Sequence, residues 1–139
     1  IRTFYLFIGP KIVSSQKSDS LLSTIDIFPT ILELCGIKIN QKKIGSSFYD
    51  FLLGKQSSPN YKEFTFSETG ALHGPYTSPE KHNVFCVKTK DYKLMYNKDN
   101  DEWSLFNLLD DPKETKNIFA TGVKAEKKLK NKLLNWINR

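Results

Sequence analysis

The stretch Val84–Asn117 reads VFCVKTKDYKLMYNKDNDEWSLFNLLDDPKETKN and contains three short runs rich in β-branched and aromatic residues, separated by polar pairs and quartets. Runs of this kind indicate strands, and their close spacing predicts a three-stranded antiparallel meander. We predict strands over Val84–Thr89, Tyr92–Tyr96 and Glu102–Asn107. The Asp-Asp-Pro that follows ends the last strand, because Pro112 has no N–H to donate to a sheet ladder.

One face of this meander is apolar and needs a cover. Side chains alternate across a strand, so Tyr92, Leu94 and Tyr96 share a face. The candidate cover is an amphipathic helix over Val123–Asn138, whose apolar stripe recurs at helical spacing. That stripe consists of Ala125, Leu129, Leu133, Trp136 and Ile137. We therefore predict a sheet packed on a C-terminal helix.

Two segments lie directly before the meander. Lys62–Ser67 alternates between polar and apolar residues and is predicted to be a fourth strand of the sheet. The loop from Glu68 to Asn83 holds two glycines, two prolines and both histidines, His73 and His82. A long loop in a compact domain is usually functional or disordered. These two histidines are the acid–base or oxyanion-binding candidates of the chain, and the alternative is that both are solvent-exposed residues without such a role.

The first sixty residues predict a strand and two helices. Tyr5–Ile8 is an apolar run before a Gly-Pro turn and is predicted to be a buried strand. In the next segment Pro29 suits the first position of a helix, and Gly36 suits the left-handed position beyond its end. Asp26 is predicted to cap this helix rather than to act in catalysis. A short second helix is closed by Gly54.

Length and composition bound the class of protein. The 139 residues are 39% hydrophobic and 13% aromatic, which is typical of a folded domain or of part of a larger one. No run approaches the roughly 18–20 apolar residues of a membrane span. The chain opens on Ile1 without a methionine or a secretory signal, and we expect it to begin inside a longer protein. Its localisation is therefore left open.

The two cysteines do not predict a metal site. Cys35 and Cys86 lie far apart in apolar surroundings and are expected to be buried free thiols. The alternative is a disulfide between them, which needs Cα atoms within about 7 Å. Their spacing does not match a metal-ligand motif, and two histidines are too few for the usual zinc set. Neither cysteine has the activating neighbours of a nucleophile. Asp110 and Asp111 precede a proline, so we assign them to a turn rather than to a metal.

The net charge of +6 lies in the last part of the chain. Residues 1–112 contain 13 basic and 13 acidic residues, whereas residues 113–139 contain 8 and 2. A lysine-rich helix face can bind phosphates. Aromatic residues for base stacking are missing from this face, because Trp136 lies on the apolar stripe. We therefore predict a solvated face and no nucleic-acid partner.

Two parts of the sequence together resemble the sulfatase family, within the wider alkaline-phosphatase-like superfamily. The first is Ser23–Gly36, STIDIFPTILELCG, followed by Gly45-Ser-Ser-Phe and Leu52-Leu-Gly. It is similar to the family segment in which an Asp, a Pro-Thr pair and a helix-ending Gly precede a Gly-Ser turn. Related phosphotransferases share this pattern.

The second part resembles the C-terminal signature of sulfatases. Tyr92-Lys-Leu corresponds to a Tyr/Trp-Lys-Leu strand, the segment 102–108 to a Glu-Leu-Tyr-Asp-Leu strand, and Asp111–Asn117 to an Asp-Pro-x-Glu-x-x-Asn loop. There are departures from the family pattern. Phe106 and Asn107 stand where Tyr-Asp is commoner, and Lys113 stands where Gly is frequent.

The resemblance implies an α+β fold in two parts. Residues 61–139 would form the four-stranded antiparallel sheet packed on the C-terminal helix. Residues 1–60 would be a strand–helix piece, with a short helix, from the end of a larger α/β sulfatase domain. The intact family enzyme would cleave a sulfate ester of a small molecule or glycan, with calcium and a formylglycine nucleophile.

The family makes formylglycine from the Cys or Ser of a Cys/Ser-x-Pro-x-Arg motif, and this sequence contains no such motif. By the resemblance, the catalytic and calcium-binding residues lie in an N-terminal domain before the start of this chain. No catalytic or metal residue is therefore carried over. His73, and after it His82, are the candidates for a part of the substrate pocket. We expect the chain alone to be inactive and to need that N-terminal domain as its partner.

Two other functions stay open at this point. One is a hydrolase or transferase of the same superfamily that acts on phosphate or phosphonate esters. The other is a stand-alone module that binds a polyanion through its basic helix.

Overall fold

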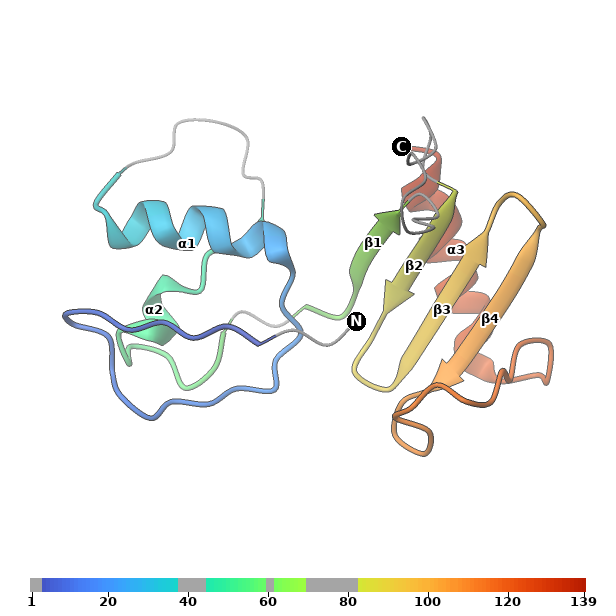
Figure 1. Cartoon of the computed structure of the whole chain (residues 1–139), viewed down its shortest axis with the longest axis horizontal. Helices are drawn as coiled ribbons and strands as arrows, with labels where there is room; N and C mark the ends of the chain where they lie inside the picture. Colours follow the sequence, from blue (N-terminus) through green and yellow to red (C-terminus); the bar gives the residue numbers. More distant parts are fainter. Residues whose placement is uncertain (1–3, 38–44, 60–61, 70–82) are drawn as a thin grey trace, which may run out of the picture. The chain divides into compact units, whose positions relative to one another are not determined.

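A computed structural model of the chain describes residues 4–37, 45–59, 62–69 and 83–139 (Figure 1). The chain divides into two compact units, Ile1–Lys62 and Glu63–Arg139. The described residues contain no helix that is long and apolar enough to cross a membrane.

The second unit is an antiparallel sheet covered on one face by a helix (Figure 1). Its strands follow one another in space in the order of the sequence. They are β1 (Thr65–Thr69), β2 (Val84–Lys88), β3 (Tyr92–Asn97) and β4 (Glu102–Asn107), and the helix is α3 (Lys124–Ile137). The predicted α+β fold, with four antiparallel strands on a C-terminal helix, is confirmed.

The register places the predicted apolar face under α3. Val87, Leu94 and Leu105 are directly opposite one another across β2, β3 and β4, and all three are fully buried. Leu129 and Leu133 of α3 pack against them in one cluster. All five residues of the predicted helical stripe belong to this cluster. The core of the second unit is therefore closed by its own helix.

Predicted and observed strands differ mainly at the sheet edge. The third strand of the meander has the predicted bounds, and the first two differ by one residue. The additional strand is β1, which begins at Thr65 instead of Lys62. Lys62 belongs to the first unit, where its ammonium group forms an ion pair with Asp26. That long-range pairing has no local signal in the sequence.

The first unit is built from short helices and extended segments. A 3₁₀ turn, η1 (Thr24–Asp26), leads into α1 (Ile27–Leu34), and α2 (Tyr49–Leu52) follows. Pro29 therefore lies in the third position of α1 rather than the first. Gly36 has the predicted left-handed backbone, with φ +72°. A small cluster of Phe48, Phe51 and Leu52 forms the core of this unit.

The predicted buried strand at Tyr5–Ile8 is wrong for the described residues. No strand is formed there, and no other strand occurs in the described part of the first unit to pair with it. The segment still alternates: the ring of Phe7 meets that of Phe48 edge-on at 5.4 Å, whereas Leu6 and Ile8 are 75% and 85% exposed. A strand sequence without a neighbouring strand leaves its backbone groups unpaired and one apolar face open to water.

The prediction for the cysteines is wrong in part. Both are free thiols, but Cys35 is exposed and Cys86 is half-buried. Cys35 lies at the end of α1 on the helix face that carries the exposed Ile31, so the apolar surroundings seen in the sequence are not packed against the described unit.

Candidate functional site

The pocket candidates His73 and His82 lie outside the described residues, and only the base of their loop is seen. β1 ends at Thr69, which is paired with Val84 at the start of β2. The next residue back, Asn83, is buried, and its carbonyl accepts the Lys98 N–H at 2.7 Å. The Asn83 side-chain amide donates to Asp99. The two ends of the loop are thus held at the sheet end that carries the β3–β4 turn.

The loop after β4 is organised by the carboxylate of Asp111. This carboxylate accepts the backbone N–H groups of Thr115 and Lys116 at 2.7 and 2.8 Å. The Lys116 N–H is the largest of several donors that lower the pKa of Asp111 below its ordinary value. Asp110 accepts from Asn107 at 2.6 Å. The predicted turn role of both acids is confirmed by these contacts.

Asn117 closes the same loop back onto the sheet. Its side-chain oxygen accepts the Leu105 N–H at 2.9 Å and the Phe119 N–H at 3.0 Å, and its amide donates to the Trp103 carbonyl at 3.1 Å. Together with the Ile118 N–H, which donates to the Leu105 carbonyl at 2.8 Å, this side chain pairs part of the open edge of β4. The Asn of the Asp-Pro-x-Glu-x-x-Asn loop therefore has a structural role in this chain.

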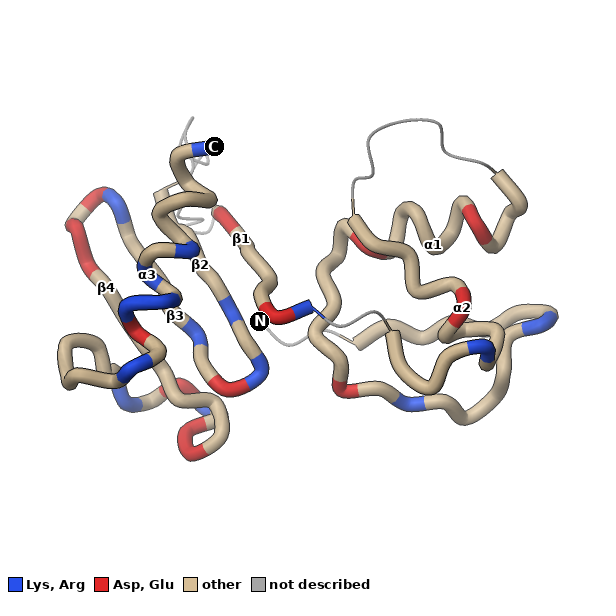
Figure 2. The backbone as a smooth tube through the Cα atoms, turned by 180° about the vertical axis from the view of Figure 1, so that it is seen from behind, with Lys and Arg blue, Asp and Glu red and all other residues tan. Residues whose placement is uncertain are grey.

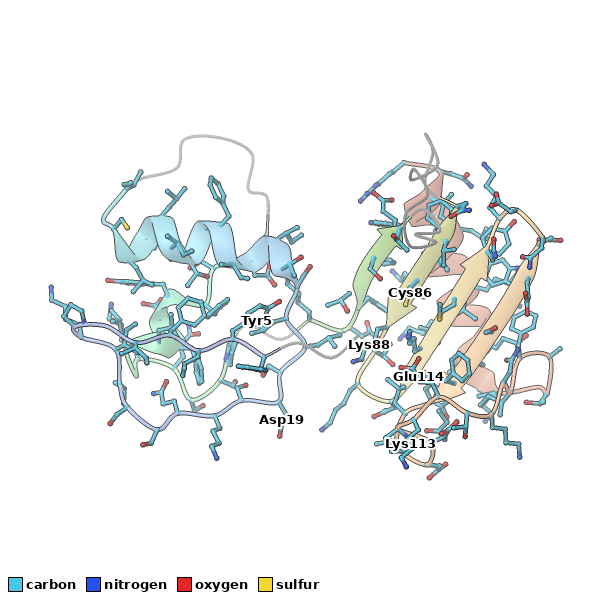
Figure 3. The ribbon with its side chains drawn as sticks, in the orientation of Figure 1. Tyr5, Asp19, Cys86, Lys88, Lys113 and Glu114 are labelled. Carbon is cyan, nitrogen blue, oxygen red and sulfur yellow. The ribbon has the colours of Figure 1, made fainter. Side chains whose placement is uncertain are left out.

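The sheet face turned away from α3 carries an ion pair and a thiol. Figure 3 labels Glu114 of the pair and Cys86. Lys93 of β3 binds Glu114 of the loop at 2.5 Å, and the two side chains are 13% and 31% exposed. Cys86 is paired with Met95 in the register, next to Lys93. Burial raises the pKa of the Cys86 thiol, and the neighbouring Lys93 charge offsets only part of that effect. A raised pKa leaves less of this thiol in the thiolate form at neutral pH.

Asp26 is the centre of the polar cluster in the first unit. Its carboxylate is fully buried and accepts the Ser23 N–H and the Ser46 N–H, both at 2.8 Å. The Lys62 ammonium lies 2.5 and 2.7 Å from its two oxygens. Gly45 lies so close that an added Cβ would be 2.3 Å from the Ile25 carbonyl oxygen.

The predicted cap role of Asp26 applies to η1 and not to α1: its carboxylate accepts the N–H of Ser23, the N-cap of η1, and makes no capping bond to α1. The same carboxylate also binds two segments from later in the sequence, through Ser46 and Lys62. Sequence reasoning found Asp26 but not its partner Lys62, which lies 36 positions away. Because every oxygen of this carboxylate already has donors, the arrangement is one that fixes the chain.

The described polar clusters position loops and do not form a metal site. Among residues 4–37, 45–59, 62–69 and 83–139, no group of three or more His, Cys, Asp or Glu side chains could hold a metal ion. Their carboxylates instead accept backbone N–H groups or pair with lysines.

Comparisons with known proteins cover the whole chain. The family model described as N-sulphoglucosamine sulphohydrolase, C-terminal, matches residues 1–139. Arylsulfatase K of Bos taurus is 30% identical over 141 residues, covering 96% of this chain and 25% of the relative. N-acetylglucosamine-6-O-sulfatase of Bacteroides thetaiotaomicron is 29% identical over 125 residues, covering 85% and 21%. The chain spans about a quarter of the length of the curated relatives it matches.

Solved structures agree with these matches. A 2-O GAG sulfatase has a TM-score of 0.75 at 25% identity, covering 94% of this chain and 28% of that one. A protein solved with its substrate D-glucosamine-2-N,6-O-disulfate has a TM-score of 0.63 at 25% identity, covering 80% and 23%.

Proposed function

The chain belongs to the sulfatase family, of which it matches the C-terminal region, and from this premise we propose that it is the C-terminal part of a sulfuric ester hydrolase. The observation that carries the proposal is the match of a C-terminal family model to all 139 residues. Relatives are named for sulfated sugars, such as N-acetylglucosamine 6-O-sulfate, and a sulfated glycan is the proposed substrate class.

The exposed apolar side chains of the first unit support the proposal that this unit packs against another region of the same enzyme. Exposed large side chains occur on the first extended segment and on and around α1; they are Phe4, Leu6, Ile8, Ile25, Phe28, Ile31 and Ile37. Exposed apolar surface of this kind marks an interaction site. In this proposal the catalytic region of the same enzyme covers it, and the segment at residues 4–8 gains there the neighbouring strands that it lacks.

Catalysis is assigned to that other region. The sequence contains no Cys/Ser-x-Pro-x-Arg motif from which formylglycine could be made. The described residues also lack a carboxylate cluster for calcium. The described residues therefore do not fit calcium, and the sequence does not fit formylglycine. In this proposal the chain contributes scaffold and part of the substrate pocket.

The reading frame upstream of Ile1 tests whether catalysis belongs to another region of the same protein. We expect it to encode a Cys/Ser-x-Pro-x-Arg motif and carboxylates for calcium. A different nucleophile motif upstream would move the protein to the phosphate or phosphonate ester enzymes of the superfamily. The absence of any catalytic region upstream would leave a stand-alone binding module.

Activity measurements test the same proposal on the protein. The chain alone is expected to leave p-nitrophenyl sulfate unhydrolysed, and turnover above buffer would refute its dependence on another region. In the complete enzyme, His73→Ala and His82→Ala are expected to raise KM or lower kcat for the sulfated sugar. Asn135→Ala, an exposed residue of α3 outside the loop, is the control. Unchanged kinetics for both histidine variants would remove the pocket role.

A further inference from the structure

The part of α3 that is not packed on the sheet carries several lysines. Residues 124–139 contain six basic residues and one acidic residue. We use the name lysine ridge for Lys124, Lys127, Lys128, Lys130 and Lys132, of which all but Lys130 are exposed. Figure 2 shows these positions along α3 in blue. A concentration of one sign of charge on one element attracts ligands of the opposite sign.

The helix that carries the ridge is held rigidly. Leu129 and Leu133, on its other face, are 1% and 0% exposed and belong to the core under the sheet. The apolar stripe of α3 is thus already used by the fold. An amphipathic helix that binds a membrane needs such a stripe free for insertion. The packing of α3 therefore argues against a lipid surface as the ligand.

Aromatic rings from other segments hold the lysines at both sides of the ridge. The Lys130 ammonium lies 4.6 Å from the centroid of Trp103 and 5.6 Å from that of Phe119. On the other side, Lys128 and Lys132 lie 5.2 and 5.4 Å from the centroid of Phe64. Cation–π contacts of this kind restrict a flexible side chain, which lowers the entropy lost when an anion binds.

The same contacts occupy the ring faces. Trp103 is stacked on Tyr96 at 4.2 Å and on Phe119 at 5.8 Å, with Lys130 above it. Single-stranded nucleic acids gain affinity by stacking bases on free aromatic faces. The rings beside this ridge are taken up by one another and by lysines, so they are poor platforms for bases.

Neighbouring acids neutralise only part of the ridge. Glu63 pairs with Lys128, and the Glu126 carboxylate accepts the Ala120 N–H at 2.8 Å. Lys124 and Lys127, exposed at the start of the helix, have no ion pair among the described residues. Lys124 and Lys132 are eight residues apart, or about 12 Å along a helix. That length accommodates several anionic groups in a row.

We propose that the lysine ridge binds a sulfated glycan chain, through several sulfate groups at once. The choice of a sulfated glycan over another polyanion rests on the proposed function. The ligand this surface fits is an extended oligosaccharide rather than a single sulfated sugar, because its charges are spread along the helix. Binding then follows counterion release and weakens steeply with salt.

Binding to heparin, as a sulfated glycan probe, tests the proposal in the full chain without any turnover. The variant Lys124→Gln/Lys127→Gln/Lys132→Gln is expected to bind heparin at least about 10-fold more weakly at low salt, with a shallower dependence on salt. The control Lys17→Gln/Lys90→Gln/Lys98→Gln removes the same charge from exposed positions outside α3 and is expected to bind within about 2-fold of wild type. Circular dichroism checks that both variants are folded.

Three outcomes would overturn the proposal. Equal weakening in the two triple variants would show that total charge, and not the ridge, determines binding. Tighter binding to a single-stranded DNA oligonucleotide or to phosphatidylserine vesicles than to heparin would assign the ridge to another ligand. Equal affinity for a sulfated disaccharide and for heparin would remove the requirement for a chain. If the ridge binds heparin but the upstream region lacks a sulfatase motif, the proposed function is wrong and the binding role of the ridge stands.

Discussion

The two units of this chain differ in how far their apolar side chains are covered. In the sheet unit, five leucine and valine side chains of β2, β3, β4 and α3 are at most 1% exposed. In the first unit the core is three residues, and Phe4, Leu6, Ile8 and Phe28 are all more than half exposed. The sheet unit contains the element that covers its core. The first unit leaves apolar side chains of its first extended segment and of α1 exposed.

The largest expected effect is the loss of a core side chain in the sheet unit. Leu105→Ala removes a fully buried side chain of β4 from the core cluster under α3 and is expected to lower the free energy of unfolding by roughly 3–5 kcal/mol. Denaturant titration followed by tryptophan fluorescence measures it, because both tryptophans, Trp103 and Trp136, lie in this unit. Leu6→Ala, in the first unit and 75% exposed, is the control and is expected to change it by less than about 0.5 kcal/mol.

The second prediction tests whether the first unit can be destabilised without the sheet unit. Asp26→Asn removes the charge that pairs with Lys62 inside the first unit, and its expected cost is roughly 2–4 kcal/mol, reduced from a fully buried pair because Lys62 is 20% exposed. Faster hydrogen exchange of the α1 amides would report it, with tryptophan fluorescence unchanged. The exposed Asp19→Asn is the control. A parallel shift in the fluorescence transition would show that the two units unfold as one, against the comparison.

A smaller effect is expected where the sheet unit closes its own edge. Asn117→Ala removes the acceptor of the Leu105 and Phe119 N–H groups and is expected to cost roughly 1–2 kcal/mol. Asn131→Ala, on the exposed face of α3, should leave the midpoint of thermal unfolding nearly unchanged. Equal melting temperatures for both variants would mean that the loop after β4 contributes nothing to the sheet.

The smallest effect is a pH dependence at Asp111. Its pKa is lowered in the folded state, mainly by the Lys116 N–H, so this carboxylate stabilises the fold above its ordinary pKa of 3.8. That contribution is lost as the pH falls below 3.8 through the folded value. Thermal unfolding measured from pH 6 to pH 3 should therefore fall less steeply in Asp111→Asn than in the wild type. Identical slopes would place the acid sensitivity of the sheet unit elsewhere.

Local patterns were enough for the sheet unit. Strand alternation placed Tyr92, Leu94 and Tyr96 on one face, and helical spacing placed Leu129 and Leu133 against it, because both elements bury one face within about eighty residues of chain. The same patterns were misleading in the first unit. The alternation over Tyr5–Ile8 is that of a strand, but a strand exists only with a neighbour, and no such neighbour lies in the described part of the first unit.

In the candidate site, too, local signals were predictable from the sequence and long-range contacts were not. Loop composition singled out His73 and His82, and a carboxylate beside a proline marked the Asp111 turn, since both signals are local. The partners of Asp26 and Lys93 lie 36 and 21 positions away, and nothing in the sequence links them.

The sequence by itself predicted the family, the order of the strands and the basic character of the last helix, because short local patterns carry each of these. It did not predict which apolar faces are covered, the ion pair of Lys62, or the aromatic rings beside the lysine ridge. Phe64, Trp103 and Phe119 reach Lys128, Lys130 and Lys132 only after α3 has packed on the sheet. Such contacts join residues up to 68 positions apart, as with Phe64 and Lys132, and depend on the packing of whole elements.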